Sequence, residues 1–159
     1  MSNRAASTKL FLPGICGSPQ TLDAGGSSID GAYIGFGSLN PYDTSNADVA
    51  TFRRALDKYS TDDVPLSQFA GNAFTAVINV KNVIDGLGAG SVTAEAIGTA
   101  IRVGVDVPSF MTDKYTCDER LALSPVTCSR GRRVFQVKDG ELANLSDQWY
   151  DGTADVKLG

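Results

Sequence analysis

The sequence predicts an α/β protein that forms one part of a larger, two-lobed chain. Three observations support this: strand patterns before residue 37, a helical stretch over residues 46–102, and a hairpin pattern after residue 132. Too few strands precede the helices to form a sheet that those helices could cover within one self-contained domain. A chain that crosses from one lobe to another and then returns accounts for this order.

The N-terminal elements follow from local signals. A short buried strand is expected over residues 9–12, where it ends at a Pro-Gly pair. Ser18 followed by Pro19 indicates the start of a helix, because serine caps free backbone amides and proline fits the first helical position. A glycine pair should end that helix. A second strand is expected over residues 31–36, with glycines where the backbone needs close approach.

Residues 37–46 form a linker rich in Ser, Asn, Pro and Gly, after which three helices of about 14, 20 and 10 residues are expected. Thr44, Ser45 or Asn46 could cap the first helix and Thr93 the third. The first two helices each carry an apolar stripe at helical spacing, which we expect to be buried between them. The stripes are Val49, Phe52, Leu56 and Tyr59 on the first helix, and Phe69, Ala73, Val77, Val80 and Ile84 on the second.

The chain is expected to end in a hairpin after an irregular passage. Two alternating segments, residues 133–138 and 141–145, flank the dipeptide Asp139-Gly140. An Asp-Gly pair between such segments is the strongest short-range signal for a hairpin turn. The cluster Arg130, Arg132 and Arg133 at its start is expected to be solvated, with an anionic partner as the alternative.

Two of the three cysteines, Cys117 and Cys128, bracket a short loop that contains proline. A disulfide between them would close a loop of about a dozen residues and stabilise the fold by roughly 3 kcal/mol in the chain-entropy model. Two free buried thiols are the alternative. If the pair forms, the protein matures in an oxidising compartment. Cys16 then remains as the unpaired cysteine.

Composition argues against several classes of function. The net charge is −4 with Lys and Arg scattered, so there is no electrostatic footprint for nucleic acid or an anionic membrane. The absence of histidine removes Ser-His-Asp and Cys-His catalysis and nearly all transition-metal sites. We expect no cofactor and no metal. Residues 1–7 lack the apolar core of a signal peptide, so the chain stays where it is made unless it is a piece of a longer secreted protein.

The ordered combination of segments resembles the type I periplasmic solute-binding proteins of ABC transporters, especially the branched-chain amino acid branch. It comprises Ile29-Asp30-Gly31-Ala32-Tyr33-Ile34-Gly35-Phe36, an Asn-Pro linker, Phe52-Arg53-Arg54-Ala55-Leu56-Asp57-Lys58-Tyr59, and the closing Val134-Phe135-Gln136-Val137-Lys138-Asp139-Gly140 followed by Trp149. Gly71-Asn72-Ala73-Phe74 stands where that family typically carries Tyr-Asp-Ala, so the tyrosine and the acid are absent here. The resemblance covers nearly all of this chain but at most half of a complete family member.

The resemblance implies a partial type I periplasmic-binding-protein fold with Rossmann-like lobes and interlobe crossings. Residues 1–38 would belong to the second lobe and residues 39–107 to the helical part of the first. Residues 108–132 would form an irregular crossing that holds the disulfide, and residues 133–159 a terminal hairpin that returns to the second lobe. Such a piece exposes sheet edges, which favours self-association.

The resemblance also places a ligand-contacting loop at Gly14, Ile15, Cys16, Gly17 and Ser18, between a strand end and a helix start. Free backbone amides at that position suit a polar or anionic group. An ordinary tight connection is the alternative. The loop lacks the carboxylate that amino-acid binders commonly supply for the ammonium group, so the group held there should be neutral or negative. Leu39 and Asn40 are expected to form a hinge and a second contact patch, or a plain turn.

The resemblance implies a non-enzymatic function: capture of an amino acid or small organic acid between two lobes outside the cytoplasm, followed by delivery to a membrane permease. A ligand-sensing receptor domain of the same fold is the first alternative. A cysteine-dependent hydrolase is the second, because the pentapeptide around Cys16 imitates a nucleophile elbow. That alternative lacks a base, since the chain has no histidine.

Overall fold

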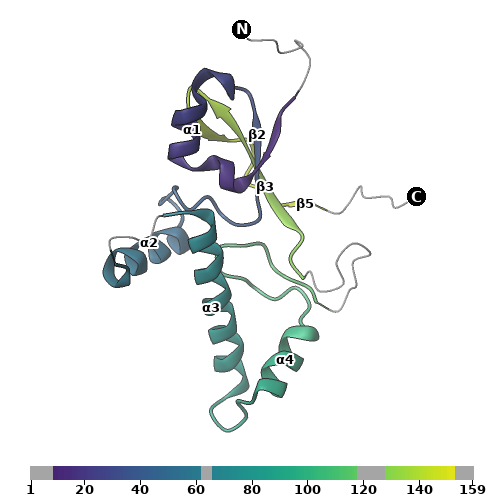
Figure 1. Cartoon of the computed structure of the whole chain (residues 1–159). Helices are drawn as coiled ribbons and strands as arrows, with labels where there is room; N and C mark the ends of the chain where they lie inside the picture. Colours follow the sequence, from purple (N-terminus) through teal and green to yellow (C-terminus); the bar gives the residue numbers. More distant parts are fainter. Residues whose placement is uncertain (1–8, 62–65, 118–127, 153–159) are drawn as a thin grey trace, which may run out of the picture.

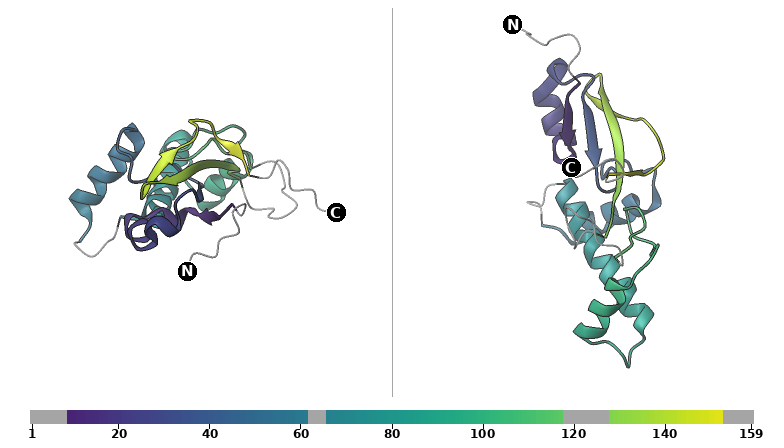
Figure 2. Two further views of the ribbon diagram at one scale, coloured as in Figure 1. Left: turned by 90° about the horizontal axis from the view of Figure 1, so that it is seen from above. Right: turned by 90° about the vertical axis from the view of Figure 1, so that its right-hand side faces the viewer.

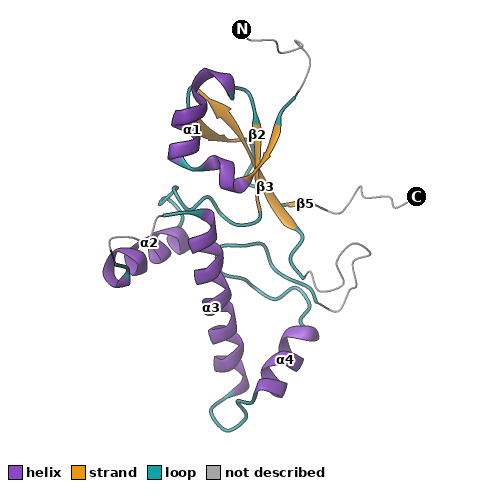
Figure 3. Ribbon diagram, in the orientation of Figure 1, coloured by secondary structure: helices purple, strands orange, loops and turns teal. Residues whose placement is uncertain are grey.

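The computed structural model describes residues 9–61, 66–117 and 128–152. The chain is elongated, with a sheet and one helix at one end and three helices at the other (Figures 1 and 2). Loops join the two parts where the chain leaves the sheet and where it returns to it (Figure 3). The elements are β1 (Phe11–Pro13), η1 (Gly14–Gly17), α1 (Pro19–Gly25), η2 (Gly26–Ser28), β2 (Tyr33–Phe36), α2 (Ala47–Tyr59), α3 (Gln68–Leu87), α4 (Ala94–Arg102), β3 (Gly131–Lys138), β4 (Glu141–Asn144) and β5 (Tyr150–Asp151).

The sheet is mixed, with strand order β1-β2-β3-β4 and with β5 paired to the start of β3. β1 and β2 run parallel because α1 connects them as a short β-α-β crossover, whereas the other pairs are antiparallel. The Asp139-Gly140 turn joins β3 to β4. Both turn residues have positive φ values, 52° and 78°, as a two-residue hairpin turn requires. The predicted hairpin is confirmed.

The core of the sheet lies between α1 and the inner faces of β2 and β3. Alternate residues of β3 are buried, so the strand presents Phe135 and Val137 to this core. The rings of Phe36 and Phe135 meet edge to face with their centroids 5.2 Å apart. The buried members of this cluster are Leu22, Ala32, Ile34, Phe36, Phe135 and Val137.

A second core cluster joins the helices α2 and α3 to residues 103–117, which follow α4 and which we call the returning segment. Val49 and Phe52 of α2 and Met111 of the returning segment are fully buried in it, and Phe74 of α3 packs against them. Polar contacts fix the returning segment in place. The Asn79 carboxamide accepts from the backbone amide of Phe110 at 2.9 Å. The fold therefore has two separate apolar cores joined by the connecting segments.

The local start signals are confirmed. Ser18, Asn46 and Thr93 cap α1, α2 and α4 through side-chain oxygens that accept from backbone amides of the first turn. Pro19 occupies the first helical position of α1. The three later helices contain 13, 20 and 9 residues, close to the expected lengths.

The predicted apolar stripe of α3 is wrong. Phe69 is 66% exposed and Val77 is 67% exposed, and Ala73 and Val80 are exposed as well. The buried residues of α3 are Gly71 and Thr75, because the contacts of Asn79 with the returning segment turn the neighbouring face inward. On α2, Val49 and Phe52 are buried as expected.

Tyr59 and the first strand were also expected to be buried, but both are exposed to solvent. Tyr59, the last residue of α2, is 76% exposed instead of buried. The first strand was expected to be buried, but Leu10 and Phe11 are exposed because β1 forms an outer edge of the sheet. The strand also extends through Pro13, which an edge position tolerates.

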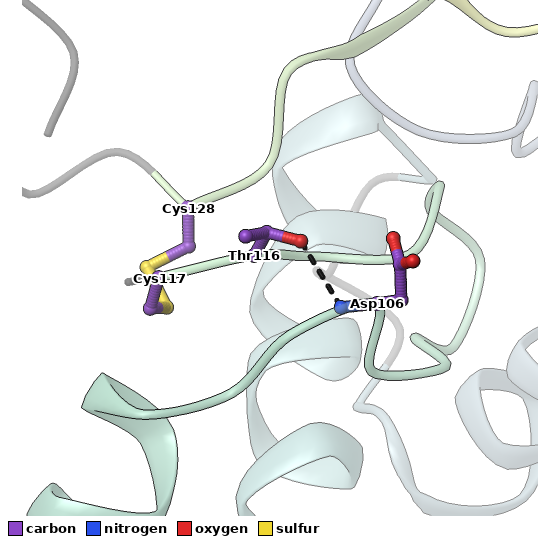
Figure 4. The surroundings of a disulfide bond; sticks show 4 residues. All are labelled: Asp106, Thr116, Cys117 and Cys128. Carbon is purple, nitrogen blue, oxygen red and sulfur yellow. Dashed lines mark hydrogen bonds between the residues drawn. A yellow bond between two sulfur atoms is a disulfide. The ribbon is translucent and has the colours of Figure 1, made fainter. Parts of the chain in front are cut away.

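A disulfide joins Cys117 and Cys128, with their Cα atoms 4.4 Å apart (Figure 4). The bond ties the strand-like segment after α4 to the chain that leads into β3. The Thr116 hydroxyl accepts from the Asp106 amide at 3.0 Å beside it (Figure 4). Within the described residues, no helix has the length and apolarity to cross a bilayer.

Candidate ligand-binding site

The predicted ligand loop forms η1, a single 3-10 turn between β1 and α1. Gly14 and Gly17 are both buried. A Cβ atom at Gly17 would lie 2.7 Å from the ring of Phe36, and one at Gly14 would collide with the Gln68 side chain at the start of α3. Close packing against the Phe36 ring therefore requires a glycine at position 17, whereas at Gly14 the flexible Gln68 side chain could move aside. The loop thereby touches the helical part of the chain.

The remaining loop residues differ in what they offer a ligand. Ile15 is exposed and Cys16, a free thiol, is half-buried. The Ser18 hydroxyl already accepts from the Thr21 amide at 3.2 Å and lies 2.9 Å from the Thr21 hydroxyl. Its main local role is therefore to cap α1.

Leu39 and Asn40 lie in the segment that leads from β2 to α2. The Leu39 amide donates to the Met111 carbonyl at 2.7 Å, which anchors the outgoing chain to the returning chain. The Asn40 carboxamide accepts from the Tyr42 amide at 3.1 Å, so this residue forms a local turn. One hydrogen bond to Met111 and one within the segment therefore hold it in place.

A cavity of about 730 Å³ lies alongside α1, and we call it the α1 cavity. Gly17 and Asn40 both line it, so two of the predicted contact residues meet there. Gly14, Ile15, Cys16, Ser18 and Leu39 are not among its lining residues, which are Gly17, Pro19, Leu22, Asp23, Gly26, Asn40, Tyr42, Asp43, Asp139, Gly140, Glu141 and Leu142.

The α1 cavity is acidic. Four carboxylates line it, from Asp23, Asp43, Asp139 and Glu141, and its lining includes no Lys or Arg. The loop Gly14–Ser18 itself contributes no carboxylate. The carboxylates come from α1, from the connecting segment and from the hairpin turn, and the fold brings them to one cavity. Such a lining attracts a cationic group.

Tyr42 forms part of the same wall. Its hydroxyl donates to the Leu66 carbonyl at 3.4 Å. Burial raises the pKa of this hydroxyl above its ordinary value near 10, and the nearby positive charge of Arg53 opposes this shift. The hydroxyl is therefore neutral at physiological pH, and its hydrogen bond links the segment before α2 to Leu66, just before α3.

The expected solvent exposure of Arg133 is wrong. The residue was expected to be solvated but is only 8% exposed. Its guanidinium donates to the Asp147 carbonyl at 3.0 Å and to the Asp147 carboxylate at 3.1 Å, and lies 5.5 Å from the Trp149 ring centroid. The alternation of β3 could have revealed this, since Arg133 shares the inward face of Phe135 and Val137.

Arg133 also lines a smaller cavity of about 210 Å³ on the connecting segment, together with Leu39 and Asn40. Asn40 therefore contributes to both cavities. Leu39 and Asn40, the predicted hinge residues, therefore line one cavity together with Arg133 and Phe135 of β3. It leaves Ile15 and Cys16 outside both cavities.

No family model matches this sequence, and no curated protein matches it. Solved structures do match its fold. A leucine-binding protein from Thermotoga maritima matches with a TM-score of 0.58 at 17% identity, over 88% of this chain and 37% of its own. A putative branched-chain amino acid ABC transporter protein from Rhodospirillum rubrum matches with a TM-score of 0.67 at 14% identity, over 89% and 38%.

A branched-chain amino acid ABC transporter protein from Thermus thermophilus, solved with bound valine, gives a TM-score of 0.60 at 13% identity. The match covers 90% of this chain and 39% of that protein. The chain therefore spans less than two fifths of the length of these structural neighbours. Its mixed sheet, its helices and its two connections carry part of the type I periplasmic-binding-protein fold.

Proposed function

We propose that this chain is part of an extracytoplasmic solute-binding protein that delivers a small molecule to the permease of an ABC importer. One observation carries the proposal. The fold matches three solved binding proteins of branched-chain amino acid transport over 88–90% of this chain. The identities of 13–17% support the fold alone, so ligand and partner are our inference.

In this proposal the sheet and the helical part belong to different lobes. Residues 1–38 and 133–159 would form part of the second lobe, residues 39–107 part of the first, and residues 108–132 the returning connection. The hydrogen bond between the Leu39 amide and the Met111 carbonyl holds the two connections together. A paired connection of this kind suits a hinge, because closure can turn about a few backbone positions.

The ligand would bind in the α1 cavity, which Gly17 and Asn40 both line. The backbone of Gly17, the residue of the predicted loop that lines this cavity, would contact the ligand's carboxylate. The cavity adds what the loop lacks, since Asp23 and Asp43 can hold an ammonium group. The combination favours an amino acid over a simple organic acid.

No catalytic step is needed for this function. Cys16 is a half-buried free thiol. A nucleophilic cysteine requires a neighbouring base, usually the imidazole of a histidine, and the chain contains no histidine. We expect no hydrolytic turnover. An activity that co-purifies with the protein and disappears in Cys16→Ser would contradict this part of the proposal.

Calorimetric titration with three matched ligands tests the proposal. L-leucine carries both charged groups, 4-methylpentanoate lacks the ammonium group and isopentylamine lacks the carboxylate. We expect leucine to bind with a Kd of about 1 mM or weaker, because a piece with incomplete lobes encloses little of a ligand. Both analogues should bind at least about tenfold more weakly.

Two variants separate the proposed contacts. Asp43→Asn should remove the preference for leucine over 4-methylpentanoate, whereas Glu141→Gln, which is not assigned to the ammonium group, should change it less. Equal binding of leucine and 4-methylpentanoate by the unmodified chain would contradict the role given to the carboxylates. Absence of leucine binding together with tight binding of a sugar or nucleotide would contradict the ligand class.

A further inference from the structure

The smaller cavity of about 210 Å³, which we call the Arg133 cavity, lies where the sheet part of the chain meets the helical part. Arg133 and Phe135 of β3 line it from the sheet, and Asn46 and Val49 line it from the N-terminal end of α2. Asn40 of the connecting segment also lines it. A group held in this cavity would therefore contact both parts of the chain.

The guanidinium of Arg133 has a buried donor that is left without a partner. Its two terminal nitrogens donate to Asp147. Its Nε atom is buried and has no hydrogen-bond partner among the described residues. A buried donor that stays unsatisfied is costly, and the great majority of such groups in folded proteins are paired. The Nε–H group therefore indicates that an additional acceptor belongs in this cavity.

Two carboxamides on the cavity wall also have donors available. The Asn40 oxygen accepts from the Tyr42 amide at 3.1 Å, and the Asn46 oxygen accepts from the Asp48 amide at 2.9 Å. These bonds fix which side of each carboxamide is the oxygen, so the NH₂ groups remain as donors. Within the described residues, neither NH₂ group has a hydrogen-bond partner. The cavity therefore has an excess of donors over acceptors.

The buried side of the cavity is positively charged. Its buried lining residues are Val49, Phe135 and Arg133, so the guanidinium is the charge that lies in low-dielectric surroundings. The two carboxylates of the lining belong to Asp43, which is exposed, and to Asp147, whose side chain is 95% exposed. Water and salt screen these exposed charges. A negative charge on the buried side is therefore favoured.

The N-terminal end of α2 strengthens this preference. Asn46 is the N-cap of this helix of 13 residues, and the partial positive charge of a helix N-terminus attracts anions. The acidic residue of the first turn, Asp48, is not among the lining residues, and its carboxylate accepts from the Met111 amide at 3.2 Å. The helix end and the guanidinium therefore act on the cavity in the same sense.

We propose that the Arg133 cavity is a binding site for a small monoanion of the carboxylate type. Its two oxygens would accept from the Arg133 Nε–H group and from the Asn46 carboxamide. A single charge fits best, because the exposed carboxylates of Asp43 and Asp147 oppose a dianion. Arg133 and Asn46 do not line the α1 cavity, so this is a second site, and the inference does not depend on the amino acid proposed above.

The NMR signal of the Arg133 Nε–H group, measured on ¹⁵N-labelled protein, provides the test. Arg133→Lys identifies the signal, because lysine keeps the positive charge and lacks this group. Titration with sodium acetate should shift the signal saturably, with a Kd of about 10 mM. Acetamide, a neutral molecule of the same shape, should bind at least about tenfold more weakly. Sodium sulfate at equal ionic strength should leave the signal nearly unchanged.

A matched pair of variants tests the contact with Asn46. Asn46→Asp keeps an oxygen that can cap α2 but replaces the NH₂ donor by a negative charge. It should weaken acetate binding at least about tenfold. The control Asn72→Asp makes the same substitution at an exposed position of α3 outside the cavity lining. It should change the Kd by less than about twofold, with helix content checked by circular dichroism.

A second titration with acetate in the presence of L-leucine separates a free carboxylate from that of the proposed amino acid ligand. Leucine should leave the acetate response unchanged. Displacement of acetate by leucine would show that one molecule uses both cavities, and it would overturn the claim of a second site. Acetate binding by a chain that does not bind leucine would support this site and contradict the proposed function.

Three other outcomes would overturn the proposal. The first is an Arg133 Nε–H signal that does not respond to acetate. The second is an equal response to acetate and acetamide, or to acetate and sulfate, since the cavity would then hold a neutral molecule or respond to salt in general. The third is an equal loss of acetate affinity in Asn46→Asp and Asn72→Asp, since net charge alone would then explain the effect.

Discussion

Replacement of Phe74 by alanine provides a sharp test of the second core. Phe74 of α3 lies between Phe52 and Phe110, with ring centroids 5.4 Å and 5.7 Å away. Removing its ring forfeits about 2 kcal/mol of apolar burial and about 0.5 kcal/mol for each of the two ring contacts. We therefore expect Phe74→Ala to lower the free energy of unfolding by about 3 kcal/mol.

Thermal unfolding followed by far-UV circular dichroism measures this effect. A loss of about 3 kcal/mol should lower the midpoint by about 6–12 °C for a chain of this length. Phe74→Leu keeps most of the apolar volume and loses only the ring contacts, so it should cost about 1 kcal/mol. The control Val103→Ala removes an exposed side chain and should stay within about 0.5 kcal/mol. An unchanged midpoint in Phe74→Ala would refute the assignment of this residue to the core.

Three further outcomes are expected. Unreduced protein should show one alkylatable thiol by mass spectrometry, and replacing Cys117 and Cys128 together by alanine should cost about 3 kcal/mol in chemical denaturation; three alkylatable thiols would contradict the disulfide. Arg133→Ala should lower the free energy of unfolding, measured by urea denaturation, by about 2–3 kcal/mol, whereas Asp147→Asn should cost less than about 1 kcal/mol because the Asp147 side chain is 95% exposed. The Tyr42 hydroxyl should titrate above pH 10 by ultraviolet absorbance, because burial raises its pKa. The folded state then keeps a proton that the unfolded state loses, so stability falls as pH rises past 10, and Tyr42→Phe should reduce this fall.

Local chemistry made the element boundaries predictable from sequence. The caps Ser18, Asn46 and Thr93 act on amides within three residues, and the Asp-Gly turn fixes its own backbone angles. The disulfide was expected from a short spacing. These features depend on neighbours in sequence, so sequence reasoning reaches them.

The buried face of α3 could not be predicted in the same way. This helix is apolar on more than one side and lacks charge over its first thirteen residues, from Gln68 to Val80, so periodicity does not single out one face. Contacts from Asn79 to Ser109 and Phe110, thirty residues farther along the chain, decide which side turns inward. Tertiary contacts of that range leave no local signature.

The candidate site, too, could be predicted from the sequence only in part. The loop was predicted from its position between a strand end and a helix start and from the family resemblance, and the structure shows that a side chain at Gly17 would clash with the Phe36 ring. The acidic wall beside it comes from Asp43 and from the turn at Asp139, more than one hundred residues beyond the loop. The fold, and not the loop sequence, therefore determines the charge that a ligand meets.

The central claim is that Gly17 and Asn40 meet at a site for a small amino acid. The most direct measurement is a titration of ¹⁵N-labelled protein with L-leucine, followed through its amide NMR signals. We expect concentration-dependent shifts that are largest at Gly17, Asn40 and Asp43, with smaller shifts from 4-methylpentanoate at equal concentration because it binds at least about tenfold more weakly. Shifts confined to other parts of the molecule, or identical responses to both ligands, would contradict it.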